Sequence, residues 1–224
     1  MAPRNDRTGR QALLAGASGL VGRALLARLL ADPRYQRVHA LQRRPSGLPT
    51  HPRLVVHTVD YQRLPRLPAV DDAYIALGTT IRDAGSRQAL RQVDFDAVLA
   101  TARAARAAGA NRLLVVSALG ADPRSVAHYS RVKGEMEAAV AALGYASVVV
   151  ARPSLLLGDR AALRQSSRPG ERLAQRLLAP VAALLPSAIR PIRADEVARA
   201  LHEAAWHSTP GLRVLTSAQM SSRR

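Results

Sequence analysis

The strongest constraint on the fold is the alternation of short apolar runs with helical patterns along this chain. Six runs precede residue 153, and a seventh lies near Leu212 to Thr216. The six are Gln11 to Ala15, Arg37 to Gln42, Arg53 to Val59, Ala73 to Leu77, Arg112 to Ala118 and Ala146 to Arg152. Most lack a polar residue at every second position, which is typical of strands buried on both faces. The pattern predicts an α/β fold, a Rossmann-type doubly wound parallel sheet.

The domain organisation follows from length and local composition. A chain of 224 residues that is 48% hydrophobic can build one sizeable core. Residues 1–10 are predicted to be a disordered basic tail, and residues 11–224 a single NAD(P)-binding domain. Helices are expected over 94–108, 127–143, 173–185 and 195–207, and residues 152–224 are expected to add a small substrate-side lobe.

Composition limits the compartment and the partners. There is no cysteine, hence no disulfide framework or thiolate metal site, and the six histidines show no metal-ligand spacing. The apolar stretches are too short to span a bilayer, and no secretory leader is seen. We therefore expect a cytoplasmic protein with no membrane contact and no bound metal, either a monomer or a homodimer.

The formal net charge of +17 raises the question of nucleic acid binding. The arginines are spread along the whole chain, and aromatic residues make up only 3% of it. A platform for stacking single-stranded bases is therefore not indicated, and we expect no specific nucleic acid partner. Arginine-driven binding of polyanions stays as a minor alternative.

A glycine-rich turn follows the first strand and opens the first helix. It runs GASGLVG and contains Gly16, Ser18, Gly19, Leu20, Val21 and Gly22. In such a turn Gly16 permits the tight bend, Gly19 lets the backbone approach a pyrophosphate, and Gly22 lets the helix pack on the sheet. The context predicts a dinucleotide loop, although the spacing is GxxGxxG rather than GxGxxG.

Residues at the ends of the next two strands bear on the choice of cofactor. Arg43 and Arg44 follow the second strand, where an NAD enzyme usually carries an acid for the ribose hydroxyls. A pair of guanidinium groups there favours a 2′-phosphate, and thus NADP(H) over NAD(H). Asp60, after the third strand, could accept from the adenine amino group or cap the following turn.

Two further strand ends are expected to line the ligand crevice. Leu77, Gly78 and Thr79 follow the fourth strand, where a glycine would let the cofactor ribose lie against backbone. Ser117 ends the fifth strand, and its hydroxyl could point into the same crevice or be only a turn residue.

Lys133 is the only lysine among 33 Lys+Arg residues, and it lies four residues after Tyr129 in the run YSRVK. On a helix this spacing places both side chains on one face. The ammonium is therefore expected to lower the pKa of the Tyr129 phenol from about 10 toward neutrality. Together with Ser117, these residues would form a catalytic donor, acid and cation.

In its ordered motifs GASGLVG, LGTT, SALGA, YSRVK, RPSLLLGD and PIRADEVARAL, the chain resembles an extended or atypical short-chain dehydrogenase/reductase. It most resembles the Tat-interacting-protein-like NAD(P)H-binding oxidoreductases. The resemblance implies that Tyr129 is the catalytic acid/base, that Lys133 holds the nicotinamide ribose, and that Ser117 polarises the substrate carbonyl. It also implies that Pro153 lies near the nicotinamide.

The expected function is an NADP(H)-dependent oxidoreductase that transfers a hydride to or from a small carbonyl or alcohol. The alternative is a non-catalytic NADPH-binding redox sensor or scaffold that regulates a partner protein. The sequence names neither the substrate nor the direction of the reaction.

Overall fold

The computed structural model describes residues 9–157, 190–207 and 209–221. Seven parallel strands form one sheet in the order β3-β2-β1-β4-β5-β6-β9. Their bounds are β1 Arg10–Ala15, β2 Tyr35–Gln42, β3 Leu54–Thr58, β4 Asp72–Ile75, β5 Arg112–Val116, β6 Ser147–Arg152 and β9 Gly211–Thr216. The strand order reverses between β1 and β4, which places a ligand crevice at the carboxyl ends of these two strands. The predicted Rossmann-type doubly wound sheet is confirmed.

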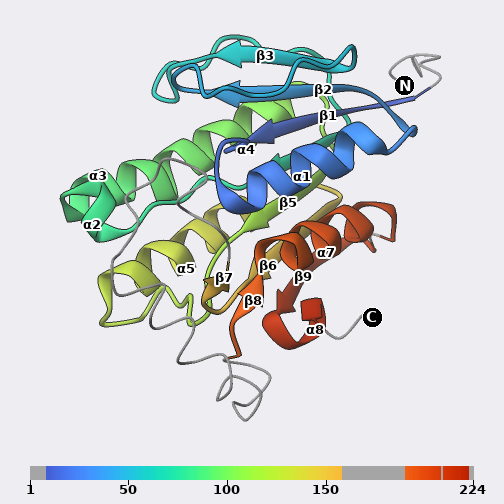
Figure 1. Ribbon diagram of the computed structural model, residues 1–224. Coiled ribbons are helices and arrows are strands. Elements are labelled where there is room, and N and C mark those ends of the chain that lie inside the picture. The colour runs from blue at the N-terminus through green and yellow to red at the C-terminus, as the bar shows by residue number, and fades with distance from the viewer. Residues whose placement is uncertain (1–8, 158–189, 208, 222–224) are drawn as a thin grey trace.

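Helices cover both faces of this sheet (Figure 1). Their bounds are α1 Leu20–Ala31, α2 Ile81–Ala84, α3 Arg87–Arg91, η1 Gln92–Ala97, α4 Val98–Ala107, α5 His128–Ala141, α7 Ala194–Trp206 and α8 Ser217–Ser221. Helices α1 and α7 pack on one face and α4 and α5 on the other. Successive residues of β1 serve both layers, because Leu14 belongs to the first core and Leu13 to the second. None of the helices within the described ranges is long and apolar enough to cross a membrane.

The helix expected over 94–108 differs from the prediction in one important respect. The helical run begins earlier, with α3, and passes through the π-helical turn η1 before it continues as α4. A π turn accommodates an extra residue and redirects the side chains within it. This turn carries Asp94, which is fully buried.

The C-terminal part of the chain mostly completes the main layers. Strand β9 pairs with β6 at the edge of the sheet, and α7 packs against α1. Only β7, Leu156–Leu157, and β8, Ile192–Arg193, form a separate two-stranded sheet. The helix predicted over 173–185 lies outside the described residues, as do residues 158–189 of the predicted substrate-side lobe.

The amino-terminal edge of the sheet is closed by a polar network around Asp72. This buried carboxylate accepts hydrogen bonds from the Tyr35 hydroxyl at 2.7 Å and from Arg112 at 2.7 Å, and Arg10 lies 3.4 Å away. The Arg10 guanidinium also stacks on Trp206 at 4.4 Å from the ring centroid. Arg10, predicted to belong to a disordered tail, is therefore the first residue of β1, while residues 1–8 of that tail lie outside the described part.

Candidate functional site

The glycine-rich loop after β1 has the close packing that the sequence predicts for two of its glycines. Gly16 has φ +88°, and a Cβ there would lie 2.5 Å from the carbonyl oxygen of Ala76. A Cβ on Gly22 would lie 1.9 Å from the carbonyl oxygen of Gly16. Gly19 differs, because a Cβ on it would meet only the Gly16 oxygen at 3.5 Å. The fold therefore needs glycine at 16 and 22, whereas Gly19 borders open space.

The first turn of α1 faces this open space with its backbone amides. Gly19 is the N-cap residue, and no side chain caps the helix. Uncapped amides and the positive end of the helix dipole favour an anion at this position. Ser18 is exposed, and its carbonyl accepts a hydrogen bond from Arg23 at 3.3 Å, whereas Val21 is buried in the core. The loop, including Leu20 at the start of the helix, thus has the shape and polarity that a pyrophosphate requires.

Arg43 and Arg44, after β2, and Asp60, after β3, are exposed. Within the described ranges neither Arg43 nor Arg44 makes an ion pair. Burial raises the pKa of Tyr61 to about 12, and the nearby Arg43 opposes that shift. Asp60 accepts a hydrogen bond from the Gln62 backbone amide at 2.9 Å. Of the two roles considered for Asp60, the structure therefore shows turn capping.

The loops after β1 and β4 meet at the reversal of strand order. The Ala76 amide donates to the Ala15 carbonyl at 2.8 Å, and Ala76 is the residue that Gly16 approaches. Leu77, Gly78 and Thr79 come next, so they lie beside the glycine-rich loop, as the sequence predicts.

Ser117 follows β5 and lies at the same edge of the sheet. Its backbone amide donates to the Ala151 carbonyl at 2.7 Å, which fixes the residue against β6. Its side chain is buried, 4% exposed, and the hydroxyl has no hydrogen-bond partner within the described part of the chain. A buried hydroxyl without a partner carries an energetic cost, which makes this position a candidate for a polar contact that the described residues do not supply.

Lys133 lies in α5 directly behind this edge. The side chain is 2% exposed, its ammonium lies 3.5 Å from the Val116 carbonyl, and it forms an ion pair with Asp94 at 2.7 Å. A Cβ on Gly78 would lie 3.7 Å from the Lys133 nitrogen. The structure thus brings Lys133, Gly78 and the end of β5 together.

Tyr129 is one helical turn before Lys133 on α5, and its pKa differs from the sequence-based prediction. Burial raises the pKa of the phenol above its ordinary value, Lys133 opposes that shift, and Asp94 adds to it. The prediction that Lys133 brings the pKa below 10 was therefore wrong for the protein alone. The ammonium has the expected effect, but burial and the Asp94 carboxylate outweigh it.

Asp94 is the residue of this site that sequence reasoning missed. One carboxylate oxygen pairs with Lys133, and the other accepts a hydrogen bond from the Thr79 backbone amide at 2.8 Å. A buried lysine requires a partner of opposite charge, so the sequence did contain a reason to search for a carboxylate. It gave no means of choosing between Asp94 and Asp96.

The end of β6 is tied to the same helix and loop. Arg152 donates to Glu137 at 2.6 Å and 3.0 Å, and Glu137 lies one turn beyond Lys133 on α5. Pro153 is buried, and its carbonyl accepts a hydrogen bond from the Leu119 amide at 2.8 Å. Pro153 therefore lies beside the segment that begins with Ser117.

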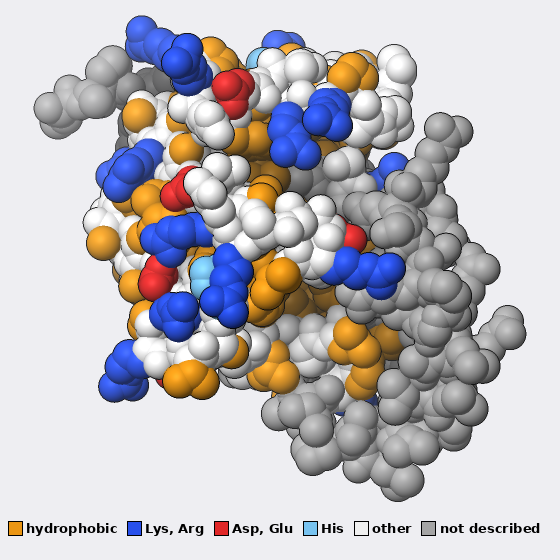
Figure 2. Space-filling view, turned by 90° about the vertical axis from the view of Figure 1, so that its left-hand side faces the viewer, with side chains coloured by type: hydrophobic (Ala, Val, Ile, Leu, Met, Phe, Trp, Pro, Cys, Tyr) orange, Lys and Arg blue, Asp and Glu red, His pale blue; other side chains and the backbone are white. Residues whose placement is uncertain are grey.

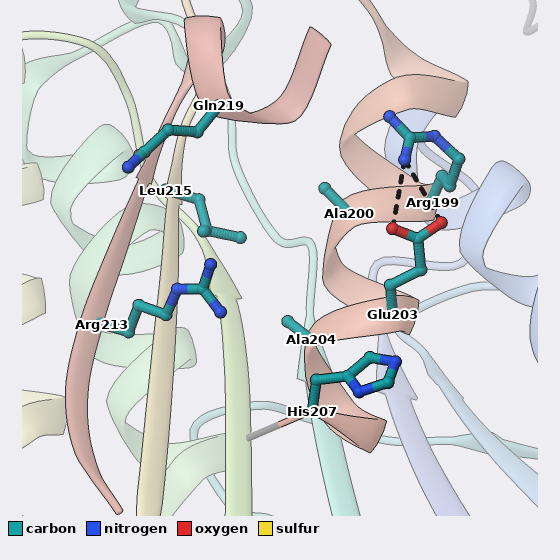
Figure 3. A pocket seen from close by; sticks show the side chains of 8 residues that line it. All are labelled: Arg199, Ala200, Glu203, Ala204, His207, Arg213, Leu215 and Gln219. Atoms are coloured by element: carbon teal, nitrogen blue, oxygen red, sulfur yellow. Dashed lines mark hydrogen bonds and ion pairs between the residues drawn. The ribbon is translucent and has the colours of Figure 1, made fainter. Parts of the chain in front are cut away.

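Figure 2 looks onto the carboxyl edge of the sheet, where blue arginines are dispersed and orange hydrophobic side chains are exposed between them. A separate hollow lies elsewhere, between α7, β9 and α8 (Figure 3). Arg199 and Glu203 form an ion pair at 3.1 Å on its α7 side, and Arg213 and Leu215 line its β9 side. None of the predicted site residues belongs to this hollow.

The geometry of the carboxyl edge fits a dinucleotide. The open space beside Gly19, the start of α1, and the hydroxyl of Ser117, which has no partner among the described residues, all lie at the carboxyl edge of the sheet. These features accommodate a pyrophosphate at one end and a polar reacting group at the other.

Comparison with known proteins agrees with this geometry. The sequence profile of the NAD(P)H-binding family matches residues 16–184. Protein fmp52, mitochondrial, from Aspergillus fumigatus is 35% identical over 210 residues, which cover 88% of each chain. Protein HTATIP2 from Rattus norvegicus is 36% identical over 173 residues, covering 75% of this chain and 69% of that protein.

Solved structures of similar shape include an oxidoreductase of the short-chain dehydrogenase/reductase family from Burkholderia thailandensis. It has a TM-score of 0.68 at 19% identity, with 97% of this chain and 95% of that chain covered. MoeE5 in complex with UDP-glucose and NAD has a TM-score of 0.70 at 22% identity, covering 92% and 75%. At these identities the likeness shows a shared fold.

The comparison also corrects the predicted compartment. Relatives from Emericella nidulans and Aspergillus fumigatus are named as mitochondrial proteins, which contradicts the cytoplasmic localisation expected from the sequence. The absence of cysteine and of a secretory leader does not separate these compartments, so the inference had too little physical basis.

The matched profile, the full-length relative and the crevice at the β1–β4 reversal lead to one conclusion. The chain belongs to the NAD(P)H-binding family and is an atypical short-chain dehydrogenase/reductase of the Tat-interacting-protein-like type.

Proposed function

We propose that this protein is an NADP(H)-dependent oxidoreductase that acts on a small carbonyl or alcohol through Ser117, Tyr129 and Lys133. The observation that carries the proposal is the buried hydroxyl of Ser117, which has no partner in the described part of the chain. A nearby helix presents a phenol and the only lysine of the sequence on one face. A hydroxyl, a phenol and an ammonium are together able to bind a carbonyl oxygen and to transfer one proton.

The cofactor would be held along the crevice from the glycine-rich loop to α5. Gly16, Gly19 and Gly22 with the first amides of α1 would hold the pyrophosphate, and Arg43 and Arg44 the 2′-phosphate. Gly78 and Lys133 would contact the nicotinamide ribose, and Pro153 would border the ring. The bound nicotinamide supplies or accepts the hydride.

In the direction of reduction, Ser117 would donate a hydrogen bond to the carbonyl oxygen of the substrate. Tyr129 would give that oxygen its proton, and Lys133 would stabilise the phenolate that remains. A raised pKa keeps Tyr129 protonated across the neutral range, which suits a proton donor. The same shift disfavours the phenolate that alcohol oxidation requires.

A second candidate is a cofactor sensor that binds NADPH without turnover and regulates a partner protein. The pairing of Lys133 with Asp94 favours it, because the pairing reduces the charge available to stabilise a phenolate. The two candidates differ in one respect, since only the enzyme consumes NADPH.

The test begins with thermal-shift titrations of the full chain with NADPH, NADH, NADP and NAD. A panel of aldehydes, ketones and quinones is then screened for oxidation of the preferred reduced cofactor. The enzyme predicts stabilisation by NADPH and turnover with at least one carbonyl. Stabilisation without turnover on any member of a broad panel would favour the sensor, and the absence of any stabilisation would contradict both.

A further inference from the structure

We propose that Asp94 is a positioning residue of this site, whose carboxylate holds the Lys133 ammonium against the backbone after β4 and counters its charge one helical turn from Tyr129. The proposal rests on the proposed function for its catalytic meaning, although its geometry is independent of any substrate.

The first support is the burial of the pair. Asp94 is 0% exposed and Lys133 is 2% exposed, with 2.7 Å between the charged atoms. Removing two charges from water has a large desolvation penalty, which a close pair of opposite charges offsets. A partly exposed ion pair between Arg91 and Glu135 also links α3 to α5, so the buried pair is not the only described link between this helical run and α5.

The second support is the double attachment of the carboxylate. One oxygen contacts Lys133, and the other accepts the Thr79 amide at 2.8 Å. A Cβ on Gly78 would lie 3.4 Å from Asp94 and 3.7 Å from Lys133, so the pair lies directly against this backbone. Asp94 therefore connects the backbone at Gly78 and Thr79 to Lys133. Gly78 and Lys133 are both proposed to contact the cofactor ribose.

The third support is the π turn that places the side chain. Asp94 lies within η1, between α3 and α4, where the extra residue of the turn shifts the helix face. Asp96 lies two residues later in the same turn and is exposed. The two aspartates offer the same chemistry in opposite environments.

The electrostatic consequence concerns Tyr129. The charged groups that act on its pKa are Lys133 of its own helix, which lowers it, and Asp94 of η1, which raises it. Of the other charges on the elements packed against α5, Arg91 pairs with Glu135, Arg152 with Glu137, and Arg106 donates to the Gly144 carbonyl. Arg87, Asp96 and Arg103 are exposed. His128 contacts the Arg87 carbonyl and Arg131. Asp94 is thus the negative charge that offsets Lys133.

The experiment uses Asp94→Asn in the full chain, because asparagine keeps an acceptor for the Thr79 amide and removes the charge. The titration of Tyr129 is followed by tyrosinate ultraviolet absorbance without cofactor, with the Asp94→Asn/Tyr129→Phe double variant subtracted to isolate this residue from the other tyrosines. The midpoint is expected to fall by about one pH unit or more. Asp96→Asn is the matched control and should leave the midpoint unchanged.

An unchanged or higher midpoint in Asp94→Asn would overturn the proposal, as would an equal shift in Asp96→Asn. If Asp94→Asn does not fold, Lys133→Met is compared with Lys133→Met/Asp94→Asn, and the second variant must have the lower Tyr129 midpoint. Where a substrate is known, the high-pH decline of carbonyl reduction should move to lower pH in Asp94→Asn. Because the absorbance titration needs no substrate, a failure of the proposed function leaves it interpretable.

Discussion

At the scale of single residues, the buried pair of Lys133 and Asp94 explains why this chain keeps one lysine. An arginine could supply the charge, but a planar guanidinium does not replace a compact ammonium enclosed by the Val116 carbonyl and Asp94. The identity of the residue is therefore set by shape as well as by charge.

Lys133→Met should lower the free energy of unfolding by about 3 to 5 kcal/mol, because it leaves the Asp94 carboxylate buried without its partner. Adding Asp94→Asn should recover part of this loss, which urea denaturation can measure. Removal of the partly exposed Arg91–Glu135 pair, as Arg91→Gln/Glu135→Gln, should cost less than removal of Lys133, about 1 kcal/mol. Equal costs for the two pairs would argue against a special role for the buried one.

His39 gives the protein a second residue-scale property, a loss of stability in mild acid. It is 4% exposed, and its ring nitrogens lie 3.0 Å from His57 and 3.0 Å from Gln11. Burial, His57 and Arg37 together lower its pKa from 6.5 to about 4. The unfolded chain therefore binds more protons between these values, so the stability from neutral His39 is complete above 6.5 and lost as the pH falls toward 4.

Between pH 7 and pH 4, protonation linked to His39 is expected to lower the free energy of unfolding by up to about 3 kcal/mol. The free energy of unfolding, measured with urea across this pH range, should change less with pH in His39→Gln than in the wild type. His207→Gln, at an exposed position, should keep the wild-type pH dependence. An identical pH dependence in His39→Gln and wild type would contradict the assignment.

At the scale of elements, the turn from β1 into α1 contains glycines with different roles, some required by packing and one available for ligand contact. Gly22 lets α1 pass the Gly16 carbonyl, whereas Gly19 borders the crevice with an ordinary φ of −78°. The same glycine-rich sequence therefore contains structural and binding positions.

Gly22→Ala should destabilise the protein by several kcal/mol, because the new Cβ would overlap backbone that cannot move freely. Gly19→Ala should leave the melting temperature within about 2 °C of the wild type and still weaken NADPH binding about tenfold or more, if the pyrophosphate lies against this backbone. Calorimetric titration and thermal unfolding measure the two effects. Unchanged affinity in Gly19→Ala would place the pyrophosphate elsewhere.

The end of β2 carries the proposed preference for NADP(H). Arg43→Ala/Arg44→Ala should weaken NADPH binding about tenfold to hundredfold, or about 1.5 to 3 kcal/mol, with little effect on NADH. Arg37→Ala/Arg213→Ala removes the same charge from positions away from this end and serves as control. Equal affinity of the wild type for NADPH and NADH would refute the preference.

How far the elements could be predicted from sequence depended on whether the signal was local. The strands and the glycine-rich turn were predictable because apolar runs and glycine spacing are local patterns. The π turn was not, since its extra residue is stabilised by contacts that Asp94 makes with α5 and with the loop after β4. The position of Arg10 was missed for a similar reason, because Asp72 and Trp206 lie far away in the sequence.

At the scale of the whole molecule, the fold brings residues from segments far apart in the sequence to one edge of the sheet. The formal net charge of the chain is +17, and on the face shown in Figure 2 the arginines are dispersed rather than gathered in one stripe. We therefore infer a protein organised around a dinucleotide site, in which most arginines are solvated surface residues. We further propose that chemistry takes place at this site on the bound cofactor.

The most direct test of that claim is NADPH oxidation by Tyr129→Phe, measured beside NADPH affinity on the carbonyl that the wild type reduces best. Phenylalanine removes the transferable proton and no proposed phosphate contact, so affinity should stay within about threefold while turnover falls by about a hundredfold or more. Turnover close to that of the wild type would contradict the account, because Tyr129 would then not be the proton donor.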